Sequence, residues 1–481
     1  MDESLSLVDH NLHELPAIGE ARRPMMFHVP SSSLFEVDEV VRRIIDSLRV
    51  GPCSRPVLRE RVGTSVGHQA LDEALRELLA LEVVSDGRPL SPDVPLSRVD
   101  RTALTTVVLN VNTGCNLSCT YCYKEDLDTP ARGRRMAADT AEAAVEMLLR
   151  ESPDEPRYTV VFFGGEPLSN RPLIEHMVDY CERRMAGLGR TVDFVMTTNA
   201  TLLDEEIVDY LDAHRFGLSI SIDGPRRIHD LNRKTVGGVG TYDVVRRKVD
   251  MLLTRYRSRP VGARVTLTRG VTDVEAIWHH LFHEVGFAEV GFAPVTSGAI
   301  DTFNLDGEEL QEVFAAFRRL GNHYVDEALA GRNTGFSNLH QIITDLHEGH
   351  RKSLPCGAGL KMLAVDHQGG LNLCHRFTGS ELSTFGDVHQ GVDTPALSAF
   401  LSKRLDRSGT GCATCRIRNL CSGGCYHESH VRYGDPTHPV YHYCELMREW
   451  IDFAIQAYAR IMQGNPAFID RHIVTRQGNR T

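Results

Sequence analysis

The sequence lacks any long apolar run and any excess of positive charge. No stretch approaches the roughly 18–20 apolar residues of a membrane-spanning helix, and the chain opens Met1-Asp2-Glu3, unlike a secretory signal. The formal net charge of −11 has the wrong sign for a protein whose main partner is nucleic acid, because phosphate binding requires a basic surface. We therefore expect a cytoplasmic protein with no membrane segment and no nucleic-acid partner.

Cysteine, by contrast, is plentiful and unevenly placed. Of the twelve cysteines, only Cys53 and Cys181 stand apart, and the other ten fall into two groups, within residues 115–122 and 356–444. In a long chain without a secretion signal, closely spaced cysteines indicate bound metal rather than disulfide bonds. Structural zinc remains an alternative to iron–sulfur clusters.

The N-terminal fifth of the chain has two predicted parts. Residues 1–24 are polar and mixed, and we expect a flexible arm. Residues 25–95 combine a hairpin around Ser31–Ser33, amphipathic helices and a short strand at Val83–Val84, which is typical of a small winged-helix domain. Winged helices often bind DNA, but residues 1–100 carry 17 acidic against 11 basic residues, and this balance favours a peptide partner.

The middle of the chain alternates β-rich apolar runs with helical patterns. Within residues 104–300 this alternation predicts an α/β fold in which parallel strands close or half-close into a partial barrel of six βα units. Functional residues of such a barrel lie at the C-terminal ends of its strands. The six predicted strands are Thr105–Val111, Tyr158–Phe163, Val192–Thr197, Gly217–Ile222, Val261–Leu267 and Val290–Pro294. Beyond the barrel we expect linking helices over 301–350, a cysteine-rich domain over 351–446, and a C-terminal helix and tail over 447–481.

The first cysteine group follows directly on the first predicted strand. Cys115, Cys119 and Cys122 are spaced so that three thiolates can hold three irons of a 4Fe–4S cube, leaving the fourth iron without a protein ligand. A structural zinc site needs a fourth ligand nearby, and none is obvious. An open iron suits a chemistry in which a substrate binds the metal.

This CxxxCxxC spacing, with Tyr121 before its last cysteine, resembles the radical S-adenosylmethionine (SAM) superfamily. The resemblance implies that the open iron chelates the amino and carboxylate groups of SAM, and that an electron from the cluster cleaves SAM to a 5′-deoxyadenosyl radical. Glu166 would hold the methionine amino group. The full set of SAM contacts implied by the resemblance, at the ends of strands two to four and just beyond, is Gly164, Gly165, Glu166, Pro167, Thr198, Asn199, Ser221, Asp223 and Arg233.

The second cysteine group resembles the seven-cysteine signature of SPASM domains, which carry two auxiliary 4Fe–4S clusters. A turn at Asp366–Gly370 is predicted to bring Cys374 back beside Cys356. The resemblance implies that one auxiliary cluster is held by Cys356, Cys374 and Cys425, and the other by Cys412, Cys415, Cys421 and Cys444. Together with the first group, this predicts three 4Fe–4S clusters and S-adenosyl-L-methionine as cofactors.

Seven cysteines are one short of the eight that would close both auxiliary clusters. Anaerobic sulfatase-maturating enzymes, a sister family, have a further cysteine six residues after the first, where this chain has Met362. An open auxiliary iron able to bind a substrate thiolate is one explanation; an unrecognised side-chain ligand or a water is the other. The same family places a catalytic Asp directly after the second auxiliary cysteine, and this chain has His375 there. His375 is therefore one candidate general base, and Asp406, in the segment that leads to Cys412, is the other.

Local sequence around both cysteine groups resembles the maturation enzymes of quinohemoprotein amine dehydrogenase, most clearly in Cys119–Leu127 and Ser422–Ser429. That resemblance implies an enzyme that joins cysteine sulfur to the side-chain methylene of Asp or Glu in a ribosomal peptide or small protein subunit. The substrate would bind through the N-terminal domain, and a flavodoxin- or ferredoxin-type protein would donate electrons. The alternatives are another SPASM maturase, forming C–C bonds or formylglycine, and a zinc-bearing winged-helix regulator.

Overall fold

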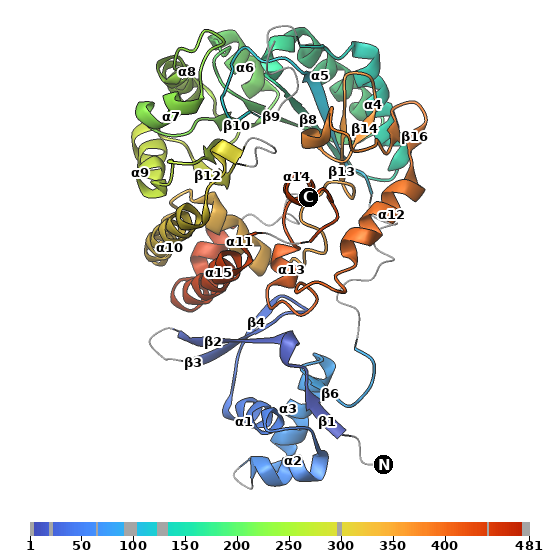
Figure 1. The fold of residues 1–481 in the computed structure, drawn as a ribbon, viewed down its shortest axis with the longest axis vertical. Coiled ribbons are helices and arrows are strands. Elements are labelled where there is room, and N and C mark those ends of the chain that lie inside the picture. Colours follow the sequence, from blue (N-terminus) through green and yellow to red (C-terminus); the bar gives the residue numbers. More distant parts are fainter. Residues whose placement is uncertain are drawn as a thin grey trace.

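The computed structural model of the chain describes residues 4–18, 23–63, 66–90, 103–122, 133–295, 301–439 and 442–473. A large C-terminal body is built on an eight-stranded sheet of order β12-β11-β10-β9-β8-β7-β13-β14, and a smaller N-terminal part lies below it in Figure 1. In the described part of the chain, no helix is both long enough and apolar enough to cross a membrane.

Six strands of the sheet pair in parallel in chain order, as in a partial barrel. Every predicted strand is confirmed, and no end is displaced by more than one residue. The six are β7 (Thr106–Asn112), β8 (Arg157–Gly164), β9 (Thr191–Thr198), β10 (Gly217–Ser221), β11 (Val261–Leu267) and β12 (Glu289–Pro294).

Helices cover the outer face of this sheet, in the upper arc of Figure 1. They are α4 (Ala138–Glu151), α5 (Arg171–Ala186), α6 (Glu205–Ala213), α7 (Arg226–Asn232), α8 (Tyr242–Arg255) and α9 (Val274–His279), which continues as the π-helix η5 (His280–Val285). Side chains along these strands point alternately to the two faces of the sheet. On β8, Tyr158 and Phe162 are fully buried against the helices, whereas Phe163 faces the opposite, inner side. The inner face is thereby left for the site.

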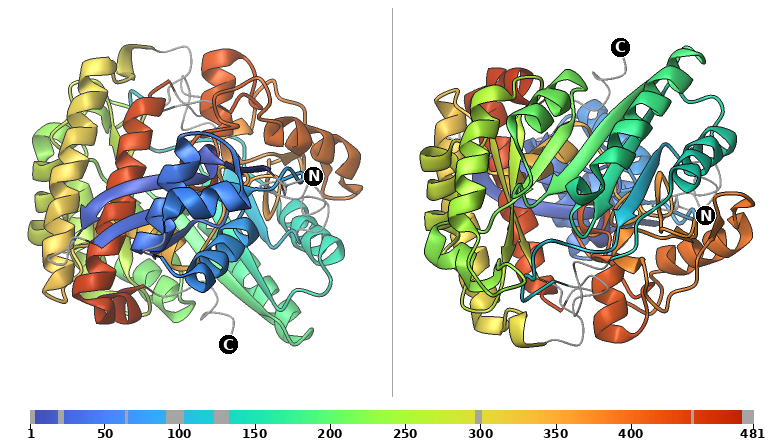
Figure 2. Two further views of the ribbon diagram at one scale, coloured as in Figure 1. Left: turned by 90° about the horizontal axis from the view of Figure 1, so that it is seen from below. Right: turned by 90° about the horizontal axis from the view of Figure 1, so that it is seen from above.

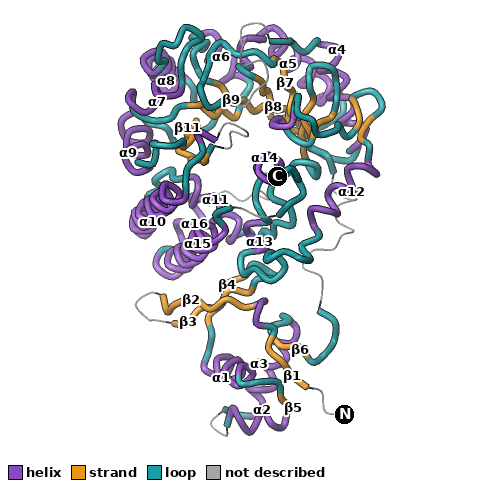
Figure 3. Tube along the Cα trace, in the orientation of Figure 1, coloured by secondary structure: helices purple, strands orange, loops and turns teal. Residues whose placement is uncertain are grey.

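The cysteine-rich region joins this sheet directly. Strands β13 (Met362–Val365) and β14 (Leu371–Asn372) form the predicted hairpin, and β13 pairs in parallel with β7 through Met362 opposite Thr106. The rest of the region is mainly loop (Figure 3). Its short elements are η7 (His375–Phe377), β15 (Gly386–Asp387), β16 (Gly391–Val392), α12 (Thr394–Leu405), α13 (Arg418–Cys421) and α14 (Tyr426–Tyr433).

Long helices close the β12 side of the body. The helix α10 begins with a capping box in which Asp306 and Glu309 bind each other's backbone N–H groups. Phe317 on this helix and Trp450 on α15 pack with ring centroids 5.5 Å apart. The elements are η6 (Asp301–Phe303), α10 (Gly307–Leu329), α11 (Ser337–His347), α15 (Cys444–Gly464) and α16 (Pro466–His472).

The N-terminal part contains two small sheets instead of an arm followed by one domain. One sheet, order β5-β1-β6, packs with three helices, and the other is an antiparallel β2-β3-β4 meander. The described residues of the expected arm, 4–18, hold β1 and β2, because Leu5, Leu12 and Leu15 are buried between polar neighbours. The elements are β1 (Ser4–Leu7), η1 (Asp9–Asn11), β2 (Leu12–Ile18), β3 (Arg23–His28), β4 (Ser33–Glu36), α1 (Glu39–Arg49), β5 (Cys53–Ser54), α2 (Arg55–Val62), α3 (His68–Ala80) and β6 (Val84–Ser85).

The meander docks on the cysteine-rich region. Phe27 and Val29 pack in one apolar cluster with Leu420 and Ile455, and Figure 2 shows the N-terminal strands crossing α15. The Asn419 side-chain amide donates to the Val29 carbonyl at 3.0 Å. The N-terminal strands therefore support the loop between Cys415 and Cys421 as well as forming part of their own domain.

We expect Asn419→Ala to lower the free energy of unfolding by about 1 kcal/mol, because the Val29 carbonyl loses the Asn419 hydrogen bond and keeps only the longer one, at 3.4 Å, from the Ser32 backbone N–H. Chemical denaturation measures the change. The exposed Asn322 on α10 supplies the control, since Asn322→Ala should change stability by no more than about 0.5 kcal/mol. Equal stability of the two variants would show that the Asn419 contact does not hold the meander in place.

Candidate functional site

The first three cysteines lie on a loop clamped at the C-terminal end of β7. The Ser118 and Thr120 amides donate to the carbonyls of Lys234 and Asn232 at 2.8 and 3.0 Å. On the other side the Asn116 side chain donates to the Thr201 hydroxyl at 2.7 Å, tying the loop to the end of β9. The loop is thus fixed between two βα connections, as expected for a site at this edge of a parallel sheet.

Glu166 links the ends of β8 and β9 beneath this loop. Its carboxylate accepts the Thr198 hydroxyl at 2.7 Å and the Asn199 amide at 2.8 Å, and only 1% of the residue is exposed. Burial raises the pKa of Glu166 to about 7, against these hydrogen bonds that lower it. Because this pKa lies near neutral pH, a cationic group beside the carboxylate would shift Glu166 to its charged form.

The glycines before Glu166 are required by a close approach of two backbones. A Cβ at Gly165 would collide with the carbonyl of Gly114, one residue before Cys115. Pro167 then begins a short 3-10 helix (η4, Pro167–Asn170), whose Leu168 amide is bound by the Glu166 side chain at 3.1 Å. This local turn explains the Gly-Gly-Glu-Pro sequence without reference to any ligand.

Asp223 and Arg233 form a buried ion pair under the last turn of the cysteine loop. Arg233 Nε lies 2.8 Å from Asp223 Oδ2, and the same oxygen accepts the Tyr121 hydroxyl at 2.7 Å. The Arg233 guanidinium also lies over the Tyr121 ring, 5.6 Å from its centroid. The pair thus anchors the tyrosine between Cys119 and Cys122. Contact of these two residues with SAM stays a prediction.

The predicted SAM contacts converge at one end of the sheet. Asn199 donates to Asn116 at 3.0 Å and lies 3.8 Å from Cys115 Sγ, so β9 meets the cysteine loop. Ser221 ends β10 half-buried and is in register with Arg264 on β11. Of Asn199 and Ser221, Asn199 is thus in contact with the loop, and binding of SAM by either stays a prediction.

The thiols of this loop fit a positively charged metal group. Burial raises the pKa of Cys115 to about 12 and that of Cys119 to about 11, the latter against the Arg233 charge. Such thiols ionise at neutral pH when they bind a metal cation, which stabilises the thiolate. In the described residues, no three Cys, His, Asp or Glu side chains come together closely enough for one metal ion. Three thiolates on one short loop can instead each bind a separate iron of a 4Fe–4S cluster.

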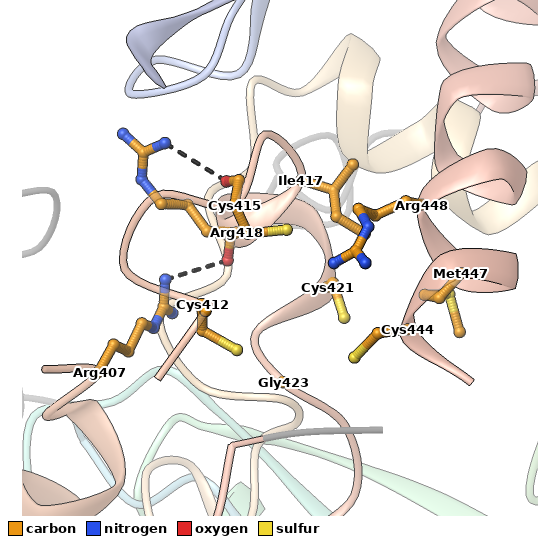
Figure 4. A pocket seen from close by; sticks show the side chains of 11 residues that line it. Arg407, Cys412, Cys415, Ile417, Arg418, Cys421, Gly423, Cys444, Met447 and Arg448 are labelled. Atoms are coloured by element: carbon orange, nitrogen blue, oxygen red, sulfur yellow. Dashed lines mark hydrogen bonds between the residues drawn. The ribbon is translucent and has the colours of Figure 1, made fainter. Parts of the chain in front are cut away.

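Four cysteines of the second group line one cavity of about 210 Å³ (Figure 4). The volume is more than ten times the 10–15 Å³ or so that one water requires. Its walls add Ile417 and Met447, with arginines at the rim. The four cysteines are Cys412, Cys415, Cys421 and Cys444, and their sulfurs point into the same space. A partly open, largely apolar cavity with four thiols fits a fully ligated cluster.

A tight connection divides these four cysteines from the other three. Ser422, Gly423 and Gly424 all have positive φ, of 57°, 76° and 85°, and a Cβ at Gly423 would meet the Pro439 backbone. This left-handed turn separates Cys421 from Cys425. Cys425 instead lies near the remaining two: burial raises the pKa of Cys374 to about 12, and the charges of Cys425 and Cys356 add to the rise.

The two candidate bases lie in different surroundings. The His375 ring packs against Phe163 on the inner face of β8, with centroids 4.1 Å apart, and so lies between the barrel and the second cysteine group. Asp406 ends α12 on the surface, where hydrogen bonds from Ser408 lower its pKa. This arrangement is typical of a turn residue. Met362 packs in the apolar cluster that contains Cys374.

The sequence did not reveal several residues that shape the site. Asn116 and Thr201 lie far apart in the sequence and come together only in the fold. Arg376, in the cysteine-rich region, acts on Arg264 of β11: burial lowers the pKa of Arg264 most, and the charge of Arg376 lowers it further. No spacing signal marks such long-range partners.

Comparison with known proteins agrees with this geometry. The Radical SAM superfamily model matches residues 109–282. The cysteine-type anaerobic sulfatase-maturating enzyme of Clostridium perfringens is 23% identical over 364 residues, 73% of this chain and 96% of the relative. The radical SAM cyclopropyl synthase TigE of Paramaledivibacter caminithermalis is 21% identical over 365 residues, 71% of this chain and 72% of the relative.

Solved structures share the architecture. Native anSMEcpe with bound AdoMet and Cp18Cys peptide is 20% identical with a TM-score of 0.63, covering 75% of this chain and 99% of that one. Streptococcus suis SuiB bound to precursor peptide SuiA is 16% identical with a TM-score of 0.52, covering 92% and 100%. Residues 109–282 therefore match the Radical SAM superfamily, and the chain has an α/β radical SAM fold with a partial barrel, similar to that of anSMEcpe and SuiB.

We expect Asp223→Asn to destabilise the protein by about 3–5 kcal/mol, because it leaves the Arg233 charge buried and uncompensated. The matched control is Asp243→Asn, which breaks an exposed ion pair with Arg226 and should cost no more than about 1 kcal/mol. Chemical denaturation of both variants measures the two changes in the free energy of unfolding. Similar small losses would mean that the Asp223–Arg233 pair does not anchor the cysteine loop.

Proposed function

We propose that the chain is a radical SAM enzyme that modifies a peptide or small protein with the help of two auxiliary 4Fe–4S clusters. The observation that carries the proposal is the shared position of β7. The C-terminal end of β7 leads into the first cysteine loop. One edge of β7 pairs with β8 and the other with β13, which leads through β14 to Cys374. The first cysteine loop and Cys374 are therefore connected to the same pair of strands, and we infer that a substrate segment on the inner face of the sheet reaches both.

The chain's own residues would hold each cofactor. Cys115, Cys119 and Cys122 would bind the cluster that activates SAM, and Glu166 would receive the amino group of SAM. When bound, the cluster and SAM together supply a carbon radical able to abstract hydrogen. The buried ring of hydrogen bonds around Glu166 and Asn199 keeps that end of the barrel rigid while the chemistry proceeds.

Peptide modification is supported by the relatives. The similar proteins include sulfatase-maturating enzymes, a cyclopropyl synthase, and a structure with a bound precursor peptide. The N-terminal meander offers β4 as an outer strand to which a substrate leader could add by backbone hydrogen bonds. A flavodoxin- or ferredoxin-type donor would supply the electrons.

Among maturase reactions, thioether formation is a specific candidate because of Met362. This residue packs beside Cys374 at the position of the eighth cysteine in the sister family. With the Met362 side chain in place of a cysteine thiolate, the first auxiliary cluster would keep one open iron for a substrate thiolate. Binding to that iron would lower the pKa of the substrate thiol. Cross-linking of sulfur to an Asp or Glu methylene would then follow. Formylglycine and C–C bond formation are the competing reactions on the same site.

The direct test is anaerobic reconstitution followed by assay with peptides encoded beside the gene. We expect about twelve irons per chain from three clusters, release of 5′-deoxyadenosine, and a modified peptide. Mass spectrometry separates the reactions. Formylglycine from cysteine loses its sulfur, whereas a thioether and a C–C cross-link both retain sulfur and lose two hydrogens. Alkylation of free thiols distinguishes these two, because only the thioether consumes the cysteine thiol. An iron-replete protein that cleaves SAM but modifies none of these peptides would contradict the maturase assignment.

SAM binding should strengthen as the pH rises through about 7. The raised pKa of Glu166 keeps its carboxyl neutral below that pH, so the charge that would bind an ammonium group is lost there. Titration calorimetry with SAM between about pH 6 and pH 8 measures this, and Glu166→Gln should bind weakly at every pH. A flat pH profile for the unaltered enzyme would remove Glu166 from the amino-group site.

Met362→Cys should close the first auxiliary cluster. We expect the iron content and 5′-deoxyadenosine formation to persist while thioether yield falls, because a protein thiolate would occupy the iron needed by the substrate. Met362→Leu is the control, since it preserves volume at a cost below about 1.5 kcal/mol and adds no ligand. Full thioether yield from Met362→Cys would show that sulfur is activated by a base, with His375 the first residue to test.

A further inference from the structure

Arg264 projects from the middle of β11 onto the inner face of the sheet. Its chain neighbours Ala263 and Val265 are buried against the outer helices, so the alternation of the strand directs Arg264 to the opposite side. The residue is in register with Ser221, the last residue of β10, and with Gly291 on β12. Arg264 therefore lies level with the end of β10, on the face that is left for the site.

The guanidinium of Arg264 extends over the neighbouring strand β12. A Cβ placed on Gly291 would lie 3.6 Å from Arg264 Nη1. Since β12 is the last strand of the sheet on this side, the guanidinium is directed away from β7 and the first cysteine loop. Within the described residues, this guanidinium has no hydrogen bond and no ion pair.

The carboxylates on the two adjacent strands do not pair with Arg264. Asp223, just past the end of β10, is held by Arg233 and accepts the Thr266 amide at 3.0 Å. Glu289, at the start of β12, forms no ion pair with Arg264 in the described part of the chain, and burial raises its pKa. The chain thus leaves the donors of Arg264 for another acceptor.

A second arginine acts on Arg264 from the cysteine-rich region. Arg376, two residues after Cys374, lies near enough for its charge to lower the pKa of Arg264, in addition to the larger effect of partial removal from water. Arg264 therefore faces the side of the sheet on which the cysteine-rich region lies. Because desolvation and a like charge both disfavour the cation, an anion beside Arg264 would be stabilised.

A guanidinium carries its donors in a planar fork that binds a carboxylate through two parallel hydrogen bonds. We propose that Arg264 binds a side-chain carboxylate of the peptide substrate, so that the enzyme selects segments that carry Asp or Glu. This inference rests on the proposed peptide modification and names the side chain that the site recognises.

The position of the guanidinium favours the peptide over SAM as the source of the carboxylate. The first cysteine loop and Glu166, where SAM is proposed to bind, belong to the β7 to β9 side of the sheet, whereas the guanidinium lies over β12. A held carboxylate also fixes the methylene beside it, which is the carbon that a thioether to Asp or Glu would use. Formylglycine formation from cysteine has no need of such a contact.

The experiment uses the full-length reconstituted enzyme and the peptide encoded beside the gene, synthesised in two versions. One version is unaltered, and the other has Asn or Gln in place of every Asp and Glu outside its leader. We expect the unaltered enzyme to prefer the acidic version by about tenfold or more in kcat/KM, and Arg264→Gln to reduce this preference about tenfold. The ratio of the two peptides removes any loss that affects both of them equally.

The matched control is Arg247→Gln, which removes an exposed arginine from α8 on the outer side of the sheet and should keep the preference. Titration calorimetry tests SAM as the other source of a carboxylate. Arg264→Gln should bind SAM within about threefold of the unaltered enzyme, since a tenfold change corresponds to about 1.4 kcal/mol. A loss of SAM affinity with an unchanged preference for the acidic peptide would assign Arg264 to SAM and overturn the proposal.

If Arg264→Gln does not fold, Arg264→Lys decides, because an ammonium group keeps the charge but not the two parallel hydrogen bonds. A reduced preference in Arg264→Lys supports the proposal, and an unchanged one overturns it. Equal kcat/KM for the two peptides with the unaltered enzyme would overturn this inference alone. An unaltered enzyme that cleaves SAM but modifies neither peptide would contradict the proposed function and this inference with it.

Discussion

The structure depends on the pairing of β7 with strands on both of its edges. On one side β8 continues the parallel barrel, and on the other β13 adds the cysteine-rich region to the same sheet. This second pairing joins the cysteine-rich region to the sheet, and bonds from Arg150 to Val388 and from Val392 to Glu151 add to it. With it, His375 reaches Phe163 on the inner face of β8, and the space between the two groups has fixed walls.

Buried charge is handled differently at each end of this space. Under the first cysteine loop, Arg233 is neutralised by Asp223, so the pair can hold Tyr121 without imposing a net charge on the loop. Glu166 is held by hydroxyl and amide donors, and burial raises its pKa to about 7. Between the auxiliary sets, the buried guanidinium of Arg404 donates to the carbonyls of Gly423 and Gly424. The Asp223–Arg233 pair suits a rigid anchor, and Glu166 suits a site that recruits a cation.

Much of the fold followed from local pattern. The six barrel strands and the β13–β14 hairpin have strong periodicity or turn signals, and they lie where the sequence predicts them. The strand β1 was missed because it pairs with β5 and β6, far along the chain. The strand β2 pairs with the neighbouring β3, but its apolar residues do not alternate with polar ones. The β13–β7 pairing has no local signal either. Arg404 follows Lys403 in the sequence, and only tertiary packing shows it to be buried. The resemblance to SPASM domains, not local spacing, divided the seven cysteines into two sets. The Tyr121–Asp223–Arg233 anchor had no sequence signal because it joins three separate segments.

The central claim is that the two cysteine groups hold independent clusters on one sheet and that only the first activates SAM. The most direct test replaces Cys115, Cys119 and Cys122 together by Ala and counts irons while assaying 5′-deoxyadenosine. The account predicts about eight irons, from two intact four-iron clusters, and no cleavage of SAM. Continued cleavage by this variant, or loss of all its iron, would contradict it.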